Sequence, residues 1–206
     1  MEIVESSYKI LYPETPEDVD SMLSRLEYIG RQCYKSQEKI TPDSKFKFIK
    51  MLINNEHTAM IEHSQLQVEF TIDRGLSHEL VRHRIASFAQ ESTRYCNYGG
   101  MGITVIPPKN IRTYPNREVW QRWVQAMEED QSHYEYFISK GIKPQDARSV
   151  LPTCLKTTLV ISTNFTEWRH IFKLRTAATA HPDMQIVLKA LLEEVKGLIP
   201  VVFEDI

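Results

Sequence analysis

The chain has few glycines and lacks the glycine-rich loops that hold phosphates through backbone amides. It contains 7 Gly in 206 residues, and neither a Gly-x-Gly-x-x-Gly motif nor a Walker-type loop occurs. If the protein binds a nucleotide, its side chains must therefore supply more of the phosphate contacts than its backbone does.

Cysteine, long apolar runs and net charge are also scarce. The three cysteines, Cys33, Cys96 and Cys154, are far apart and form no Cys-x-x-Cys pair, which argues against a disulfide framework and for a reducing compartment. Residues 1–9 lack the apolar run of a signal peptide, and no stretch has the length of a membrane span. A net charge of −2 argues against nucleic acid as a partner. We expect a cytoplasmic protein with no membrane or nucleic-acid partner.

Length and periodicity predict an α+β protein. With 42% hydrophobic and 25% charged residues, the chain can bury a sizeable core, and we predict one domain over residues 1–206. Alternating apolar residues at 66–72 predict a strand with one buried face. Thr15-Pro16-Glu17-Asp18 and Thr41-Pro42-Asp43-Ser44 each predict a helix start. We expect a small, mostly antiparallel sheet flanked by helices.

The remaining elements follow from similar signals. They are a helix that Ser77 caps, a short β-prone run at 103–106, a long helix over 116–140 that Gly141 ends, a short helix from Pro144 carrying Arg148, a strand at 155–162, a helix that starts at Asn164 or Thr166, and a last helix from Pro182 that Gly197 ends.

Three arginines and a histidine are concentrated in one short stretch. Arg82, His83 and Arg84 are adjacent, Ser92 follows after seven residues, and Arg94 comes two residues later. Neighbouring cations repel one another, so folding alone rarely selects such a cluster. The planar guanidinium of Arg binds phosphate oxygens two at a time. The stretch therefore predicts a site for a small phosphorylated ligand.

Each of these cations also has a structural interpretation. Arg82 and Arg84 fit the last turn of a helix, where a cation offsets the helix dipole by about 0.3–1 kcal/mol, and His83 fits a buried, hydrogen-bonded histidine. Arg148 and Arg175, taken singly, fit surface arginines. Two more cations in apolar helices nevertheless favour a site for several phosphates.

Two other groups are poor candidates for chemistry. His57, Glu62 and His63 lack the i, i+4 spacing of two histidines that bind a metal from one helix, so we predict no metal site. Cys154 would need a neighbouring base or cation to become a nucleophile. Lys156 is near in sequence, but nothing places it beside the thiol, and we predict a buried, inert cysteine.

The string from Arg82 through Ser92 to Arg94 and Tyr95 resembles the signature of flavin-dependent thymidylate synthases, the ThyX family. Further segments resemble family motifs in the same order along the chain. They are His57–His63, Ala147–Pro152, Thr163–Arg175 and Ala180–Asp183. The resemblance implies a homotetramer with active sites shared between subunits and FAD held where several chains meet. It also implies conversion of dUMP to dTMP, with methylenetetrahydrofolate as carbon donor and NADPH as the reductant of the flavin.

The resemblance further implies roles for single residues. The implied FAD-binding residues are Arg82, His83, Arg84, Gln90, Asn164 and His170. The implied dUMP-binding residues are Glu79, Arg82, Gln90, Ser92, Arg94, Arg148 and Arg175. Arg175 is the implied catalytic residue, because a fixed cation beside the uracil ring would stabilise the N3-deprotonated form in a dry pocket.

Three positions depart from the family pattern. Ala59 stands where Ser or Thr is frequent, Gln90 where an acid is common, and Thr166 where Arg is frequent. These departures remove a hydroxyl, a negative charge and a phosphate partner, respectively. The arginines of the signature are unaffected.

Two rival functions use the same residues. One is a flavin-independent pyrimidine methyltransferase with Cys154 as nucleophile, although Leu155 stands where the classical thymidylate synthases have a histidine after the cysteine. The other is a nucleotide-phosphate sensor or oligomeric scaffold that binds without catalysis. A role in RNA binding is weaker still.

Overall fold

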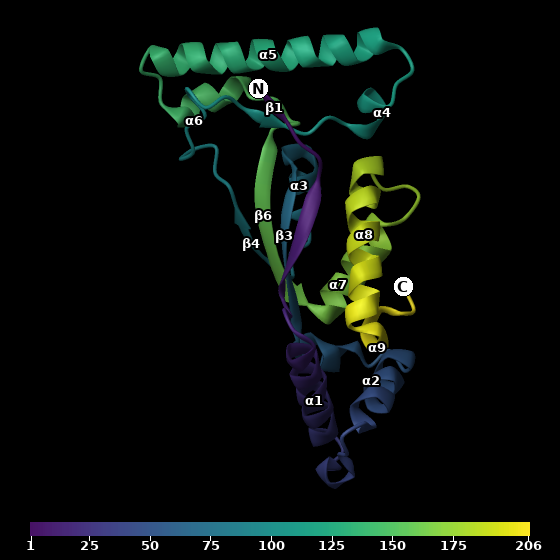
Figure 1. The fold of residues 1–206 in the computed structure, drawn as a ribbon. Helices are drawn as coiled ribbons and strands as arrows, with labels where there is room; N and C mark the ends of the chain where they lie inside the picture. The colour runs from purple at the N-terminus through teal and green to yellow at the C-terminus, as the bar shows by residue number, and fades with distance from the viewer. The chain divides into compact units, whose positions relative to one another are not determined.

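The computed structural model describes residues 1–206, and its backbone divides into two compact units (Figure 1). The first unit comprises residues 1–7, 70–82 and 88–160, and the second comprises residues 8–69, 83–87 and 161–206. The predicted single domain over residues 1–206 stays a prediction. None of the helices is both long and apolar enough to cross a membrane.

Helices and strands are interspersed along the chain, as the sequence predicts for an α+β protein. In order they are β1 (Glu2–Ile3), β2 (Ser7–Tyr12), α1 (Pro16–Gln32), η1 (Gln37–Lys39), α2 (Ser44–Asn54), η2 (Thr58–His63), β3 (Gln65–Asp73), α3 (Arg74–Leu80), β4 (Ser87–Gln90), β5 (Thr104–Val105), α4 (Lys109–Arg112), α5 (Arg117–Ser139), α6 (Pro144–Ala147), η3 (Arg148–Val150), β6 (Lys156–Asn164), α7 (Phe165–Arg175), α8 (Pro182–Leu198) and α9 (Pro200–Phe203). The η elements are short 3₁₀ helices.

The main sheet has four strands in the order β2-β3-β6-β4. β3 and β4 begin in residues of the second unit and end in the first, whereas β2 and β6 run the other way. Neighbouring strands are therefore antiparallel, and the predicted fold class is confirmed. In β3, Leu66, Val68, Phe70 and Ile72 are buried and the residues between them are not. A separate parallel pair joins β1 to β5, with Glu2 opposite Thr104.

The core of the second unit fixes α7, which carries several predicted site residues. Phe165 and Phe172 pack edge-on against Phe203, with ring centroids 5.6 and 5.8 Å away. The indole of Trp168 is fully buried and donates a hydrogen bond to the carbonyl of Leu66 at 2.8 Å. These contacts leave α7 little freedom to rotate about its axis, because burying such rings elsewhere would expose large apolar areas.

An ion pair holds α7 to the end of the chain. Arg169 donates to both carboxylate oxygens of Asp205 at 2.6 Å, and it also donates to the carbonyl of Val202. The two hydrogen bonds match the planar guanidinium to the carboxylate, which is the stronger geometry for such a pair.

The core of the first unit lies beneath α5. Ile103, Val105, Met127 and Leu155 form a buried cluster. Tyr134 on the same helix is fully buried. This cluster supports the start of β6.

Several predicted boundaries are confirmed. Thr15 caps α1 and exchanges hydrogen bonds with Asp18 in a capping box, with Pro16 at the first helical position. Asn164 caps α7 by accepting from the backbone N–H of Glu167. Gly141, at φ +79°, follows α5 as expected.

Other predicted boundaries are wrong. Asp73 is the residue that caps α3, because its carboxylate accepts a hydrogen bond from the backbone N–H of Leu76. Ser77 therefore lies inside the helix and not at its start. Gly197 lies within α8 and does not end it. The second helix begins at Ser44 and not at Thr41.

Candidate functional site

The three adjacent residues Arg82, His83 and Arg84 of the signature do not share one environment. His83 is buried, with 5% of its surface exposed, whereas Arg82 and Arg84 are exposed on either side of it. Arg82 belongs to the first unit and His83 to the second. The buried imidazole therefore anchors the segment, and the two arginines extend into solvent.

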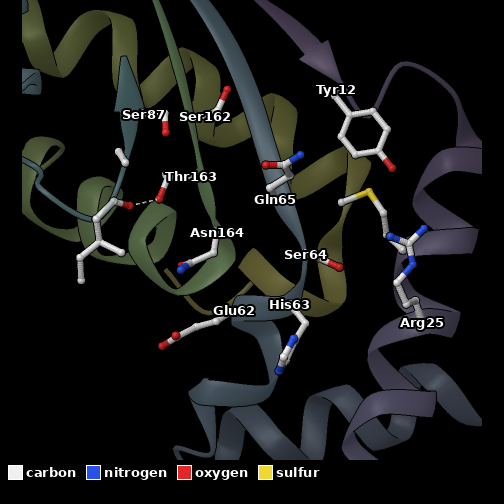
Figure 2. A pocket seen from close by; sticks show the side chains of 13 residues that line it. Tyr12, Arg25, Glu62, His63, Ser64, Gln65, Ser87, Ser162, Thr163 and Asn164 are labelled. Carbon is white, nitrogen blue, oxygen red and sulfur yellow. Dashed lines mark hydrogen bonds between the residues drawn. The ribbon is translucent and has the colours of Figure 1, made fainter.

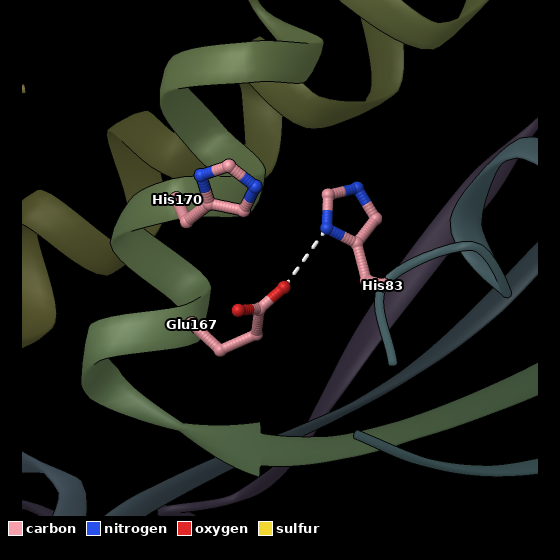
Figure 3. A group of neighbouring side chains, drawn as sticks. All are labelled: His83, Glu167 and His170. Carbon is pink, nitrogen blue, oxygen red and sulfur yellow. Dashed lines mark hydrogen bonds and ion pairs between the residues drawn. The ribbon is translucent and has the colours of Figure 1, made fainter. Parts of the chain in front are cut away.

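Within the second unit, His83 lies between Glu167 and Arg175 of α7, and Figure 3 shows it with Glu167 and His170. Its Nδ1 is 2.9 Å from Oε1 of Glu167, and its Nε2 is 3.1 Å from Nε of Arg175. His170 approaches the same ring edge-on, with centroids 5.5 Å apart. Three predicted site residues, His83, His170 and Arg175, are thus brought together around Glu167.

The electrostatics of this group keep His83 neutral. Burial lowers the pKa of the His83 imidazole, and the nearby charges of Arg175 and His170 act in the same direction. The hydrogen bond and charge of Glu167 oppose them only in part, so the pKa stays below its ordinary value. At neutral pH the ring offers one donor and one acceptor nitrogen.

This cluster also bears on the expectation of no metal. The donor atoms of His83, Glu167 and His170 all lie within 4.8 Å of one another. However, Nε2 of His83 already faces the guanidinium of Arg175, and Nδ1 already faces the Glu167 carboxylate. A cation at Nδ1 would displace the proton between His83 and Glu167 and would lie close to Arg175. We therefore interpret the group as hydrogen-bonded.

A polar cavity of about 450 Å³ lies elsewhere in the second unit (Figure 2). Its walls come from the end of β6, the start of β3, η2, α1 and the segment that follows Arg84. The lining residues are Tyr12, Met22, Arg25, Glu62, His63, Ser64, Gln65, Ile85, Ala86, Ser87, Ser162, Thr163 and Asn164. The volume is within the range of pockets that hold small molecules.

The cavity contains polar atoms that suit a polar ligand. The hydroxyl of Ser64 is buried and has no hydrogen-bond partner, which is costly unless something else fills that role. Asn164 uses its Oδ1 to cap α7 and is itself one of the lining residues. Thr163 is fixed by a hydrogen bond to the carbonyl of Ile85. Arg25 brings a cation to the wall.

Gln90 at the end of β4 is held in the first unit by two buried hydroxyls. Its Nε2 donates to Ser77 Oγ at 2.8 Å and to Thr157 Oγ1 at 3.3 Å. Ser77 and Thr157 are both fully buried. The Ser77 hydroxyl donates its own proton to the carbonyl of Arg74, so it can only accept from residue 90. The amide orientation is therefore determined by the network.

Predicted phosphate-binding residues gather at the turn that follows β4. Ser92 Oγ accepts from the backbone N–H of Arg94 at 3.3 Å. Arg148 donates to Thr93 Oγ1 at 3.3 Å and to the carbonyl of Gln145 at 3.1 Å. Arg94 is exposed and lies over the ring of Tyr95. Arg148 from η3 and the 92–94 turn thus form one polar surface within the first unit.

Two acids of the first unit differ in their surroundings. Glu79 is half-buried on α3. Glu91 accepts from Tyr98 Oη at 2.7 Å and from Lys156 Nζ at 3.0 Å. Burial alone would raise the pKa of the Glu91 carboxyl, but these hydrogen bonds and the charge of Lys156 together hold it below its usual value. Glu91 is therefore ionised and anchors the strand end.

Cys154 has the properties of an inert thiol. Burial raises the pKa of its thiol to about 11, and its Sγ lies 3.1 Å from Sδ of Met127. Lys156 is paired with Glu91 instead of the thiol. A thiol with this pKa is protonated at neutral pH and is a poor nucleophile.

The predicted site residues fall into two groups by unit. Glu79, Arg82, Gln90, Ser92, Arg94 and Arg148 belong to the first unit, and His83, Arg84, Asn164, His170 and Arg175 belong to the second. Sequence reasoning missed Glu167, Ser64, Ser77 and Thr157. A spacing of three residues between Glu167 and His170 was the signal for the first of these, because it places both on one face of a helix. No comparable pattern marks the three hydroxyls.

Comparison with known proteins gives consistent matches over most of the chain. A family model described as thymidylate synthase complementing protein matches residues 18–201. A protein of Geobacter sulfurreducens named flavin-dependent thymidylate synthase is 30% identical over 192 residues, which is 92% of this chain and 82% of that protein. A protein of Pyrococcus furiosus with the same name is 30% identical over 188 residues, covering 89% and 75%.

A solved structure has the same fold. The UMP/dUMP methylase PolB from Streptomyces cacaoi, bound with 5-Br dUMP, superposes with a TM-score of 0.78 at 21% identity. The match covers 99% of this chain and 96% of that chain.

Proposed function

Because this chain belongs to the ThyX family of thymidylate synthase complementing proteins, we propose that it is a flavin-dependent thymidylate synthase that methylates dUMP to dTMP. The observation that carries the proposal is the family match over residues 18–201. Every residue that we assign to the site lies inside this range.

We assign the binding of FAD to residues around the polar cavity and the signature. His83 is buried and Asn164 is half-buried, the exposed Arg82, Arg84 and His170 supply further donors, and Gln90 is a further contact. The charged side chains that line the cavity, among them Arg25, Glu62 and His63, support a polar ligand there, since the hydroxyls and amides of a dinucleotide can hydrogen-bond to such groups. When bound and reduced, FAD supplies the hydride of the reaction.

We assign the binding of dUMP to the polar surface of the first unit and to Arg175. Ser92, Arg94 and Arg148 would hold the phosphate, because hydroxyl and guanidinium donors surround the same turn. Gln90 and Glu79 would contact the nucleoside. Arg82 would contact either nucleotide.

Arg175 has the chemistry needed at the uracil ring. A guanidinium is a planar cation with several N–H donors, and the hydrogen bond to His83 fixes one edge of it. Such a cation would favour the N3-deprotonated uracil and so increase the electron density at C5. This activation requires no covalent bond to a cysteine.

The finer features of the reaction come from the family. We propose methylenetetrahydrofolate as carbon donor, NADPH as the source of reducing equivalents, and a cytoplasmic homotetramer with shared active sites. Two departures from the family pattern limit the contacts to the flavin. The Thr166 hydroxyl donates to the carbonyl of Thr58 at 2.9 Å, and Ala59 offers no hydroxyl.

The rival with a cysteine nucleophile is not favoured by the state of Cys154. Its thiol pKa of about 11 and its contact with Met127 describe a structural residue.

Product analysis tests the proposal. The purified full-length chain should show the visible absorption of a bound flavin and should convert dUMP to dTMP when both methylenetetrahydrofolate and NADPH are present. Removal of the flavin should abolish turnover, and added FAD should restore it. A colourless protein that forms dTMP would favour the cysteine mechanism, and nucleotide binding without dTMP would favour a sensor.

A further inference from the structure

Glu167, His83 and Arg175 form a continuous chain of hydrogen bonds inside the second unit. Glu167 and Arg175 lie eight residues apart on α7, a separation of about 12 Å along a helix. The imidazole of His83, from a distant part of the sequence, bridges them with contacts of 2.9 and 3.1 Å. These hydrogen bonds therefore couple the first turn of α7 to the last residue of the same helix.

The contact with Arg175 shows which nitrogen of His83 carries the proton in this arrangement. A guanidinium has only N–H donors, so the Nε2 atom that faces it must be an acceptor. A neutral imidazole with an acceptor at Nε2 carries its proton on Nδ1. That proton points to the Glu167 carboxylate at 2.9 Å. The contact with Arg175 and the contact with Glu167 therefore require the same tautomer of His83, the Nδ1–H form.

Glu167 is itself held firmly in place. It is the third residue of α7, its backbone N–H donates to Asn164 Oδ1 at 2.8 Å, and only 8% of its surface is exposed. A carboxylate in the first turn also interacts favourably with the helix dipole. The helix cap, the carboxylate and the imidazole thus form a rigid support.

We propose that Glu167 is a positioning residue, which fixes the tautomer of His83 and thereby the orientation of the Arg175 guanidinium. The role of Arg175 at the uracil ring rests on the function proposed above. The arrangement has the same logic as a carboxylate that orients a metal-binding histidine, with the guanidinium in place of the metal. Removing such a supporting partner typically costs about 10–100-fold in activity.

Two substitutions of Glu167 separate orientation from simple packing. Glu167→Gln keeps a carbonyl oxygen that accepts from Nδ1–H, so it should retain the tautomer and most of the activity. Glu167→Ala removes the acceptor, and we expect kcat/KM for dUMP to fall about 10–100-fold while bound flavin is retained. Glu193→Gln is the matched control, because its side chain is 72% exposed on α8.

Nitrogen NMR of histidine-labelled, flavin-loaded protein reads the tautomer without reference to turnover. At neutral pH, His83 should be the Nδ1–H form in the wild type, the Glu193→Gln control and Glu167→Gln. In Glu167→Ala the signal should change to a mixture or to the Nε2–H form. If Glu167→Ala does not fold, the Glu167→Gln spectrum decides, since it must still show Nδ1–H.

A failure of the positioning role of Glu167 can be distinguished from a failure of the proposed function. Absence of dTMP formation by the wild type would reject the function, whereas the His83 signal would still test the support. An Nε2–H tautomer in the wild type, or a Glu167→Ala enzyme with unchanged kcat/KM and an unchanged His83 signal, would overturn the inference. A stoichiometric metal ion found by elemental analysis would overturn it as well, because the metal would replace the Nδ1 proton.

Discussion

The side-chain amide of Gln90 donates a hydrogen bond to the Ser77 hydroxyl at 2.8 Å. The Ser77 hydroxyl donates its only O–H to the carbonyl of Arg74, so it cannot also donate a hydrogen bond to an acid at position 90. The family commonly has an acid there. In this chain the network selects an amide.

Gln90→Glu is therefore expected to destabilise the protein. A carboxylate oxygen would face the lone pairs of the Ser77 hydroxyl, and an unsatisfied buried contact costs about 1–3 kcal/mol. Denaturant unfolding should show this loss, with Gln121→Glu on the exposed face of α5 as the control. Equal stabilities of Gln90→Glu and the wild type would show that the hydroxyl pair does not select the amide.

Arg175→Ala should retain flavin but lose turnover. The substitution removes the cation proposed to polarise the uracil ring, while the polar cavity is untouched. The flavin content and the rate of dTMP formation are the two measurements, and Lys173→Ala on the same helix is the control. Normal turnover of Arg175→Ala would reject the catalytic role.

Arg82→Lys should weaken the binding of phosphorylated ligands. A charge-assisted hydrogen bond contributes about 1.5–3 kcal/mol, and Lys cannot form the paired contact of a guanidinium. We expect the dissociation constant for dUMP or FAD to rise about tenfold or more. The exposed Arg122→Lys on α5 should leave both affinities unchanged. If Arg82→Lys behaves like this control, the paired contact is absent.

Cys154→Ser should remain active. The thiol pKa of about 11 makes a thiolate scarce at neutral pH, and replacing the sulfur beside Met127 should cost only about 1 kcal/mol of stability. Loss of turnover in a folded Cys154→Ser protein would restore the nucleophile hypothesis.

The neutral His83 predicts how stability depends on pH. Burial lowers its pKa in the folded chain, whereas the unfolded chain titrates near about 6.5. The unfolded state then binds more protons as the pH falls. The contribution of His83 to the free energy of unfolding is therefore complete above about pH 6.5, and it declines as the pH falls through the pKa of His83 in the folded chain. Unfolding of the wild type and His83→Gln between about pH 5 and 8 should give a flatter profile for the variant. Parallel profiles would mean that His83 does not titrate differently on folding.

The sequence signals predicted the helices and strands that are specified by residues close together in the sequence. Alternation of apolar residues gave β3, and Thr15 and Asn164 marked helix starts because a cap needs only its own first turn. The edge strands β2 and β4 were not predicted, since an edge strand is only partly buried and alternates less clearly. Ser77 was misplaced because Asp73, at the end of a strand, satisfies the same cap.

The candidate site was predictable only in part for the same reason. A family signature gave His83 and Arg175, but their contact joins residues 92 positions apart. Glu167 is 84 positions from His83, and no local pattern encodes that pairing. The role of Glu167 emerges only when the folded chain brings the carboxylate to the imidazole.

We infer that this chain activates C5 of dUMP through its own arginines and a bound flavin. The most direct measurement is the release of tritium from C5-labelled dUMP by the purified protein. This mechanism predicts that release requires FAD and reduced nicotinamide, persists in Cys154→Ser and is lost in Arg175→Ala. Release that continues without flavin, or that depends on Cys154 and not on Arg175, would contradict it.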